Sequence, residues 1–282
     1  MKHCIAITLI VLSLAHVRAD LPPTTANVVF HLDASDLDGD GVAEGSLEGG
    51  QSEGAVSNWV DKSSGGLLLE QTTPAAQPSY YTSDFGSNSS AYVSFDGDDF
   101  LSESVANFRG SDSAGTITFV FRIPSDGGFY VLTSSDQSSG NRYVTTGVSF
   151  NEEGDIYVQQ NNANPTYDLL YGQPTEVNKP HRAFVMSDGS DYFIYTDGSD
   201  NTLTAFRGGD TGDWYGDTAS RDNLVVGALT RTATSGHFVG DLAEIIVFDA
   251  ALDENDLAAV DAYLNQKYFN DMQEDGITIR IR

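Results

Sequence analysis

The sequence predicts an all-β sandwich that is closed by one C-terminal amphipathic helix. Short segments rich in Val, Ile, Phe, Tyr and Thr recur along the chain, and Gly, Asp, Asn and Ser separate them, which is typical of a β-sandwich. Helical periodicity is confined to one segment near the C-terminus. The Asp-Gly pair at 188–189 lies between two apolar segments and predicts a hairpin turn. The expected strands are Asn27–Leu32, Ala91–Phe95, Thr116–Arg122, Phe129–Ser134, Tyr143–Phe150, Asp155–Gln160, Arg182–Ser187, Tyr192–Thr196, Asn223–Ala228 and Leu242–Phe248.

The C-terminal helix is predicted by its first turn and by its apolar spacing. The run Asp253–Asp256 offers an N-cap followed by acidic residues, which suits the start of a helix. Leu257, Val260, Leu264 and Tyr268 then recur on one helical face, and we expect this face to pack on the sandwich. Residues 271–282 are expected to form a tail, in which Ile277–Ile281 is a candidate edge strand.

The N-terminus predicts secretion. An apolar stretch over Cys4–Ala15 follows a basic residue and leads to a small-residue cleavage site that ends at Ala19, which is the pattern of a signal peptide over residues 1–19. The stretch is too short to cross a bilayer as a helix, and no later stretch is long enough, so no membrane insertion is expected. Residues 20–270 are expected to form one domain. The only cysteine of the chain, Cys4, would leave with the signal peptide, so no disulfide or thiol nucleophile is expected in this domain.

The charge balance is strongly acidic. The chain has 14 Lys and Arg residues against 41 Asp and Glu residues, a formal net charge of −27 at pH 7. Nucleic-acid binding requires clustered Lys and Arg side chains that neutralise phosphates, whereas the basic residues here are scattered singly. The composition therefore excludes a nucleic-acid partner. It suits solubility in a salty medium or the binding of divalent cations.

Several segments stand in an order that points to a known fold family. They are Val28–Asp36, Val56–Gly65, Gln77-Pro78, Val93–Leu101, His181–Val185 with Tyr192–Gly198, and Gly240–Asp249 with the helix ending at Tyr268. This order resembles the concanavalin A-like lectin/glucanase superfamily, in particular its bacterial laminin G-like branch. The resemblance covers most of the chain after residue 20 and implies a jelly roll of two antiparallel sheets. It leaves the function open, because this fold carries lectins, adhesion modules and polysaccharide-degrading enzymes.

A candidate calcium loop follows the first predicted strand. The run Asp-Leu-Asp-Gly-Asp-Gly at 36–41 fits the first half of an EF-hand loop, in which alternate carboxylates surround a hard cation. The match is incomplete, because position twelve is Leu47 in place of a bidentate glutamate. The alternative is an acidic surface turn without an ion. The predicted ligands are Asp36, Asp38, Asp40, the Val42 carbonyl and Glu44.

A candidate saccharide site lies in the long segment before residue 218. This segment mixes carboxylates and glycines with two adjacent aromatic residues. A flat ring stacks on the apolar face of a pyranose, while carboxylates hold its hydroxyls. The alternative is an acidic loop anchored by one tryptophan. Trp59, in contrast, is expected in the core because Val56 and Val60 flank it. The predicted saccharide-binding residues are Asp210, Asp213, Trp214 and Tyr215.

No catalytic residues are predicted. Glycoside hydrolysis needs two carboxyl groups on either side of one bond, and the Glu-x-Asp-x-x-Glu strand of the glucanases is missing from this chain. Asp241 and Glu244 have a spacing that would place them on opposite faces of a strand. Glu244 fits better as a buried partner of a basic residue. His31 and His181 lie in predicted strands, where a structural role is the ordinary one.

These observations favour a secreted, non-catalytic module that binds extracellular carbohydrate or a cell-surface partner, with a structural calcium ion. Two alternatives remain open at the level of the sequence. One is a polysaccharide-degrading enzyme, a glycoside hydrolase or a lyase, with a divergent site. The other is a structural surface protein that neither binds a sugar nor catalyses a reaction.

Overall fold

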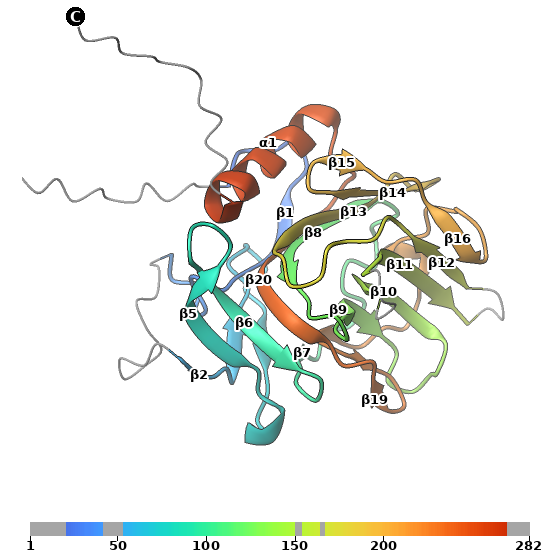
Figure 1. The fold of residues 1–282 in the computed structure, drawn as a ribbon. Helices are drawn as coiled ribbons and strands as arrows, with labels where there is room; N and C mark the ends of the chain where they lie inside the picture. Colours follow the sequence, from blue (N-terminus) through green and yellow to red (C-terminus); the bar gives the residue numbers. More distant parts are fainter. Residues whose placement is uncertain (1–20, 42–52, 150–153, 164–166, 270–282) are drawn as a thin grey trace, which may run out of the picture.

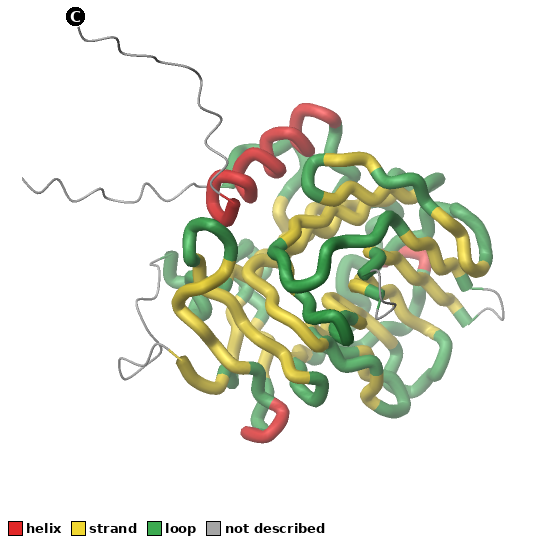
Figure 2. The backbone as a smooth tube through the Cα atoms, in the orientation of Figure 1, coloured by secondary structure: helices red, strands yellow, loops and turns green. Residues whose placement is uncertain are grey.

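The computed structural model describes residues 21–41, 53–149, 154–163 and 167–269, which form a sandwich of two antiparallel β-sheets (Figure 1). Within these residues each large sheet contains nine strands. Strands make up the body of the molecule, and the helical turns lie at its margins (Figure 2). The predicted fold class, two antiparallel sheets with one C-terminal helix, is therefore confirmed.

The first sheet, sheet 1, carries the C-terminal helix on its outer face. Its strands are β1 (Val28–Asp33), β2 (Glu53–Ala55), β5 (Ser79–Phe85), β6 (Ser90–Asp96), β8 (Gly115–Arg122), β13 (His181–Ser187), β14 (Tyr192–Thr196), β15 (Ser199–Asp200) and β20 (Val239–Phe248). They are ordered β15-β14-β13-β8-β20-β6-β5-β2, and β1 pairs with β20. The predicted hairpin at residues 188–189 is confirmed, because Ser187 of β13 pairs with Tyr192 of β14.

The second sheet, sheet 2, is ordered β16-β12-β11-β10-β9-β17-β7-β4-β3. Its strands are β3 (Asn58–Val60), β4 (Leu68–Glu70), β7 (Leu101–Glu103), β9 (Phe129–Ser135), β10 (Arg142–Val148), β11 (Ile156–Asn162), β12 (Asp168–Tyr171), β16 (Thr204–Arg207) and β17 (Leu224–Val226). A small hairpin of β18 (Leu229–Thr230) and β19 (Thr234–Ser235) and two 3-10 turns, η1 (Pro74–Ala76) and η2 (Tyr215–Asp217), complete the loops.

The main core lies between the two sheets. Alternate residues of each strand point into it, as the period of two in a β-strand requires. On β11, for example, Ile156 and Val158 belong to this core. Trp59 is fully buried in the same core, as the sequence predicts.

A second apolar cluster joins the C-terminal helix to sheet 1. Helix α1 (Glu254–Leu264) and the π-helical turn η3 (Asn265–Phe269) pack on its outer face beside β1 (Figure 1). The N-cap Asp253 accepts hydrogen bonds from the backbone N–H groups of Asn255 and Asp256, which satisfies donors that the first turn leaves unpaired. Val260, Leu264 and Tyr268 are buried there, so the predicted helix and its apolar face are confirmed.

All ten predicted strands are present, with ends that differ by a few residues. The other strands were not predicted; they are β5, of seven residues, and the strands of two to four residues β2, β3, β4, β7, β12, β15, β16, β18 and β19. No helix in the described part of the chain is long and apolar enough to span a membrane. The predicted signal peptide at 1–19 and the tail at 271–282, including the candidate strand at 277–281, lie outside the described residues.

Candidate functional site

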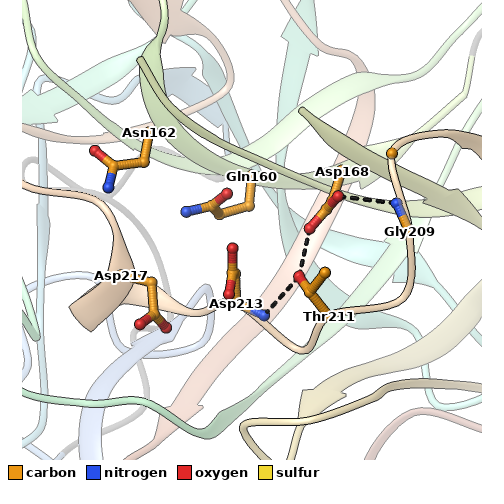
Figure 3. Close-up of a pocket in the computed structure, with 8 residues that line it drawn as sticks. Gln160, Asn162, Asp168, Gly209, Thr211, Asp213 and Asp217 are labelled. Carbon is orange, nitrogen blue, oxygen red and sulfur yellow. Dashed lines mark hydrogen bonds between the residues drawn. The ribbon is translucent and has the colours of Figure 1, made fainter. Parts of the chain in front are cut away.

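A polar pocket lies where β11 and β12 of sheet 2 meet the segment 208–217, and it is called the loop pocket below (Figure 3). Its volume of about 480 Å³ falls in the range of small-ligand sites. Amides, carboxylates and a hydroxyl converge on this space from both sides. The pocket is lined by Gln160, Asn162, Asp168, Gly208, Gly209, Thr211, Asp213 and Asp217.

The strand side of the pocket extends the inward-facing row of β11. Ile156 and Val158 fill the core, and the same alternation then places Gln160 and Asn162 beyond its edge. Asp168, at the start of β12, is the register partner of Gln160. The Gln160 amide donates to the Thr218 hydroxyl at 2.6 Å, which fixes its orientation. Polar groups therefore replace apolar ones where the inner face reaches the end of the sandwich.

The loop side is fixed to the strands mainly through Asp168. The backbone N–H of Gly209 donates to Oδ1 of Asp168 at 3.0 Å, and the Thr211 hydroxyl donates to Oδ2. Gly208 has a φ of +69°, and a side chain at this position would also collide with Asp168. Glycine suits this position because L-residues rarely adopt positive φ. Asp168 thus organises the loop, and Figure 3 shows its carboxylate hydrogen-bonded to Thr211 and to Gly209.

Three further contacts hold the middle of the loop. The Ser187 hydroxyl donates to the carbonyl of Gly212, and the Tyr192 hydroxyl donates to the carbonyl of Asp213. The Trp214 backbone N–H donates to Oδ2 of Asp217 at 2.8 Å, which closes the turn η2. The loop that carries Asp213 and Asp217 is therefore tied to sheet 1 as well as to sheet 2.

The prediction that Trp214 and Tyr215 form a stacking surface for a sugar is wrong. Trp214 is 1% exposed and Tyr215 is fully buried. The Tyr215 ring packs edge-on against Phe108, with ring centroids 5.3 Å apart, and the Trp214 indole lies against Gly115. Burying two large rings stabilises the loop far more than exposing them would. These residues anchor the site and do not face a ligand.

The two predicted aspartates have different surroundings. Asp213 lines the loop pocket. Asp210 instead accepts the backbone N–H of Tyr192 at 2.6 Å through Oδ1, and it is not among the lining residues. Asp210 therefore positions the loop, whereas Asp213 faces the space that a ligand would occupy.

The pocket is electronegative. Burial, together with the neighbouring carboxylates Asp217 and Asp168, raises the pKa of Asp213 above its ordinary value. None of the described lining residues is basic. The nearby Arg221 is 1% exposed, and its guanidinium donates to the carbonyls of Phe108, Thr218 and Tyr215 and to the Ser134 hydroxyl. The lining can accept hydrogen bonds from hydroxyl or amine groups, and it disfavours anions.

Sequence reasoning missed much of this site. Gln160, Asn162, Asp168 and Thr211 line the pocket without having been singled out. A signal was present for two of them, because the run Gln159–Asn162 continues the alternation of an apolar strand with amides. Outside the pocket lining, sequence reasoning also missed Phe206 of β16. This side chain is 73% exposed and packs edge-on against Tyr171, with ring centroids 6.1 Å apart.

The candidate calcium loop is partly described. Oxygens of Asp36, Asp38 and Asp40 lie within 4.8 Å of one another. The Lys62 ammonium also lies 2.8 Å from Oδ2 of Asp36, so one positive charge already faces this group. Val42 and Glu44, the other predicted ligands, lie outside the described residues.

A buried ionic cluster lies between sheet 1 and the C-terminal helix, centred on Glu244. The Lys267 ammonium lies 2.9 Å from Oε2 of Glu244 and 2.9 Å from Oδ2 of Asp33. His31 Nε2 and the Tyr263 hydroxyl contact Oε1 of Glu244 at 2.6 and 2.7 Å. The prediction that Glu244 is the buried partner of a basic residue is confirmed.

The predicted placement of Asp241 and Glu244 on opposite strand faces is wrong. Strand β20 has a register shift between Leu242 and Glu244, which is the signature of a β-bulge. Asp241 pairs with Arg122, which lies over the outer-face ring of Tyr92. Both carboxylates therefore lie on the outer face of sheet 1, each with its own cation.

Comparisons with known proteins support the fold. The sequence matches no protein-family model and no curated protein. Among solved structures, it is similar to CBM40 of the Ruminococcus gnavus IT-sialidase bound to α2,3-sialyllactose, with 12% identity and a TM-score of 0.50 over 61% of this chain and 96% of that one. It is also similar to the Trypanosoma rangeli sialidase in complex with 2,3-difluorosialic acid, with 13% identity and a TM-score of 0.52 over 86% of this chain and 34% of that one. At these identities the likeness shows the fold alone, a β-sandwich.

Proposed function

We propose that this protein is a secreted, non-catalytic carbohydrate-binding module and that its loop pocket holds the saccharide. The observation that carries the proposal is the convergence of Gln160, Asn162, Asp213 and Asp217 on one open space of about 480 Å³. Carboxylates accept hydrogen bonds from sugar hydroxyls, and amides both accept and donate them. The similar CBM40, whose structure contains α2,3-sialyllactose, supports a glycan as the ligand class.

The arrangement of the pocket favours binding over catalysis. Both oxygens of Asp168 accept hydrogen bonds from the loop, and Asp217 caps its own turn. A glycosidase instead needs two carboxyl groups that are available to the scissile bond. The concanavalin A-like, laminin G-like branch remains our proposal for the family, and it agrees with a binding role.

The test is a glycan array followed by calorimetry with purified protein. Replacing the exposed amide of Asn162 (N162A) should weaken saccharide binding about fivefold, the equivalent of one hydrogen bond of about 1 kcal/mol. Asp126→Asn changes an exposed carboxylate in another turn and should leave the affinity unchanged. Steady release of reducing ends or of unsaturated uronates from a polysaccharide would overturn the non-catalytic assignment. A silent array combined with self-association would favour a structural surface protein.

The extracellular location rests on the N-terminal pattern. The small-residue site at Ala19 predicts that the exported protein begins near Asp20. Edman sequencing of protein recovered from the medium of an expressing cell tests this location. Retention of residues 1–19 on the recovered chain would contradict it.

We also propose a structural calcium ion at Asp36, Asp38 and Asp40. Three hard oxygen donors that approach within 4.8 Å suit this cation. An ion that binds only to the folded state stabilises that state, so millimolar calcium should raise the melting temperature and a chelator should lower it. Asp38→Asn should abolish the response. A wild-type protein that does not respond to calcium would remove the ion from this proposal.

A further inference from the structure

We infer that the loop pocket selects saccharides without acid groups and rejects sialylated, sulfated or uronate-bearing glycans. This inference rests on the proposed function and names the ligand class of the same pocket. It separates this protein from the similar CBM40, which is bound to an acidic trisaccharide in its structure.

The described lining of the loop pocket carries negative charge only. Asp168, Asp213 and Asp217 contribute three carboxylates, and the described lining residues include no Lys, Arg or His. Their acid neighbours strengthen the field, because Asp188 and Asp191 interact electrostatically with Asp210 on the same loop. A glycan carboxylate or sulfate that enters this space meets like charges with no cation to pair with. Such pairs repel each other by an amount that rises as water is excluded.

The two arginines nearest to the loop in the sequence do not line the pocket. Arg207 directly precedes Gly208, but its guanidinium lies 4.5 Å from the ring centroid of Tyr167. Arg221 follows the loop, but it is 1% exposed and donates to backbone carbonyls behind Tyr215. Neither is among the residues that line the pocket. Both arginines therefore contact other parts of the protein and contribute no positive charge to the lining.

The lining offers more hydrogen-bond acceptors than donors. Carboxylates only accept hydrogen bonds, and the amides of Gln160 and Asn162 add both kinds of group. Because the Gln160 amide nitrogen already donates to Thr218, the lining is rich in acceptors. A ligand that matches it must be rich in donors, and a neutral pyranose offers several hydroxyl donors.

The experiment measures binding to matched pairs of glycans that differ only in an acid group. Suitable pairs are lactose with 3′-sialyllactose, and laminarihexaose with its chemically sulfated form, within an array that contains many other such pairs. The neutral member of each bound pair should bind at least tenfold more tightly at low salt. Raising the salt to about 0.5 M should narrow the ratio, because the Debye length then falls to a few ångströms.

A variant identifies the source of the selectivity. Asp213→Asn keeps the size of the side chain and removes one charge from the pocket, so the neutral-to-acidic ratio should fall at least threefold. Asp126→Asn removes one charge elsewhere and should leave the ratio unchanged. Tighter binding of acidic members, or an unchanged ratio in Asp213→Asn, would overturn the inference and leave the proposed function intact. An array on which no glycan binds would overturn the proposed function itself, and the inference with it.

Discussion

Glu244 shows how a single buried residue holds two elements together. Its carboxylate contacts His31 of β1 and Lys267 and Tyr268 of the C-terminal segment. Burial alone would raise the pKa of Glu244, but the charge of Lys267 and the hydrogen bond and charge of His31 together lower the pKa below its ordinary value. The ionised form is therefore the one that the fold requires.

We predict that Glu244→Gln destabilises the protein by about 3 kcal/mol, because it leaves the buried Lys267 without one of its two counter-charges. Urea unfolding followed by tryptophan fluorescence measures the change. Glu70→Gln alters an exposed carboxylate and should shift stability by less than about 0.5 kcal/mol. Equal stabilities of the two variants would show that the cluster contributes nothing to the folded state.

The local sequence around each residue explains why Glu244 was predicted correctly and Trp214 wrongly. Glu244 stands among Ile and Val residues of a strand, so its burial and its need for a cation follow from local context. Trp214 stands among Asp and Gly residues that are typical of an exposed loop. Its burial depends on Gly115, about a hundred positions away in the chain, which leaves room for the indole. Such a contact has no local signal.

Among the elements, the segment 208–221 depends on Arg221. Its guanidinium donates to the carbonyls of Thr218, Phe108 and Tyr215 and to the Ser134 hydroxyl, at distances between 2.6 and 2.9 Å. A single residue thus ties the end of the pocket loop to β9 and to the segment before β8. Lysine has one nitrogen and cannot reproduce this fork.

We predict that Arg221→Lys costs about 2 kcal/mol of stability, because buried carbonyls lose their donors. It should also weaken saccharide binding severalfold, since Asp213 and Asp217 lose their fixed positions. Thermal unfolding and calorimetry on the same sample measure both effects. Arg142→Lys, which keeps the ion pair of a partly exposed side chain with Asp136, is the control. Full glycan affinity in a destabilised Arg221→Lys protein would show that the loop does not need this anchor.

The elements also show the limit of pattern reading. Ten of the strands and α1 were predictable because their apolar residues repeat at the period of a strand or a helix, although β5, of seven residues, was not predicted. Short edge strands such as β15 and β16 contain two and four residues, too few for a period to emerge. The bulge in β20 leaves no mark in the sequence, yet it moves Asp241 to the face opposite to the one that simple alternation assigns.

For the whole molecule, the buried cluster predicts how stability depends on pH. Burial would raise the pKa of Asp33, but Lys267 and Lys62 lower it well below its ordinary value. Burial would lower the pKa of Lys267, but Glu244 and Asp33 raise it. The carboxylates therefore contribute stability above their unfolded pKa values of about 4, and the ammonium contributes below its unfolded value of about 10.4.

We predict a stability plateau between about pH 5 and pH 9, with losses below about pH 4 and above about pH 10. Urea unfolding across this range checks the shape of the profile. In Glu244→Gln the free energy of unfolding should fall less steeply as the pH drops below about 4. The slope should decrease by up to the contribution of one proton, because one titrating group is gone. A wild-type stability that stays constant down to pH 3 would contradict the charge assignments in the cluster.

The overall fold was predictable and the binding site only partly so, for one physical reason. A sandwich follows from periodic burial along each strand, whereas the loop pocket joins β11, β12 and the segment 208–217 through contacts that are distant in sequence. Asp213 was predictable by its acidic surroundings. Its partners Gln160 and Asn162 came together with it only through the pairing of sheet 2.

The central claim is that the loop pocket binds a glycan, and a nuclear magnetic resonance titration tests it most directly. Isotope-labelled protein would be titrated with the neutral oligosaccharide that binds most tightly on the array. Backbone amide shifts should concentrate at residues 160–162 and 208–218, and Asn162→Ala should reduce them. Shifts that concentrate on another part of the sandwich, with these residues unchanged at saturation, would contradict the account.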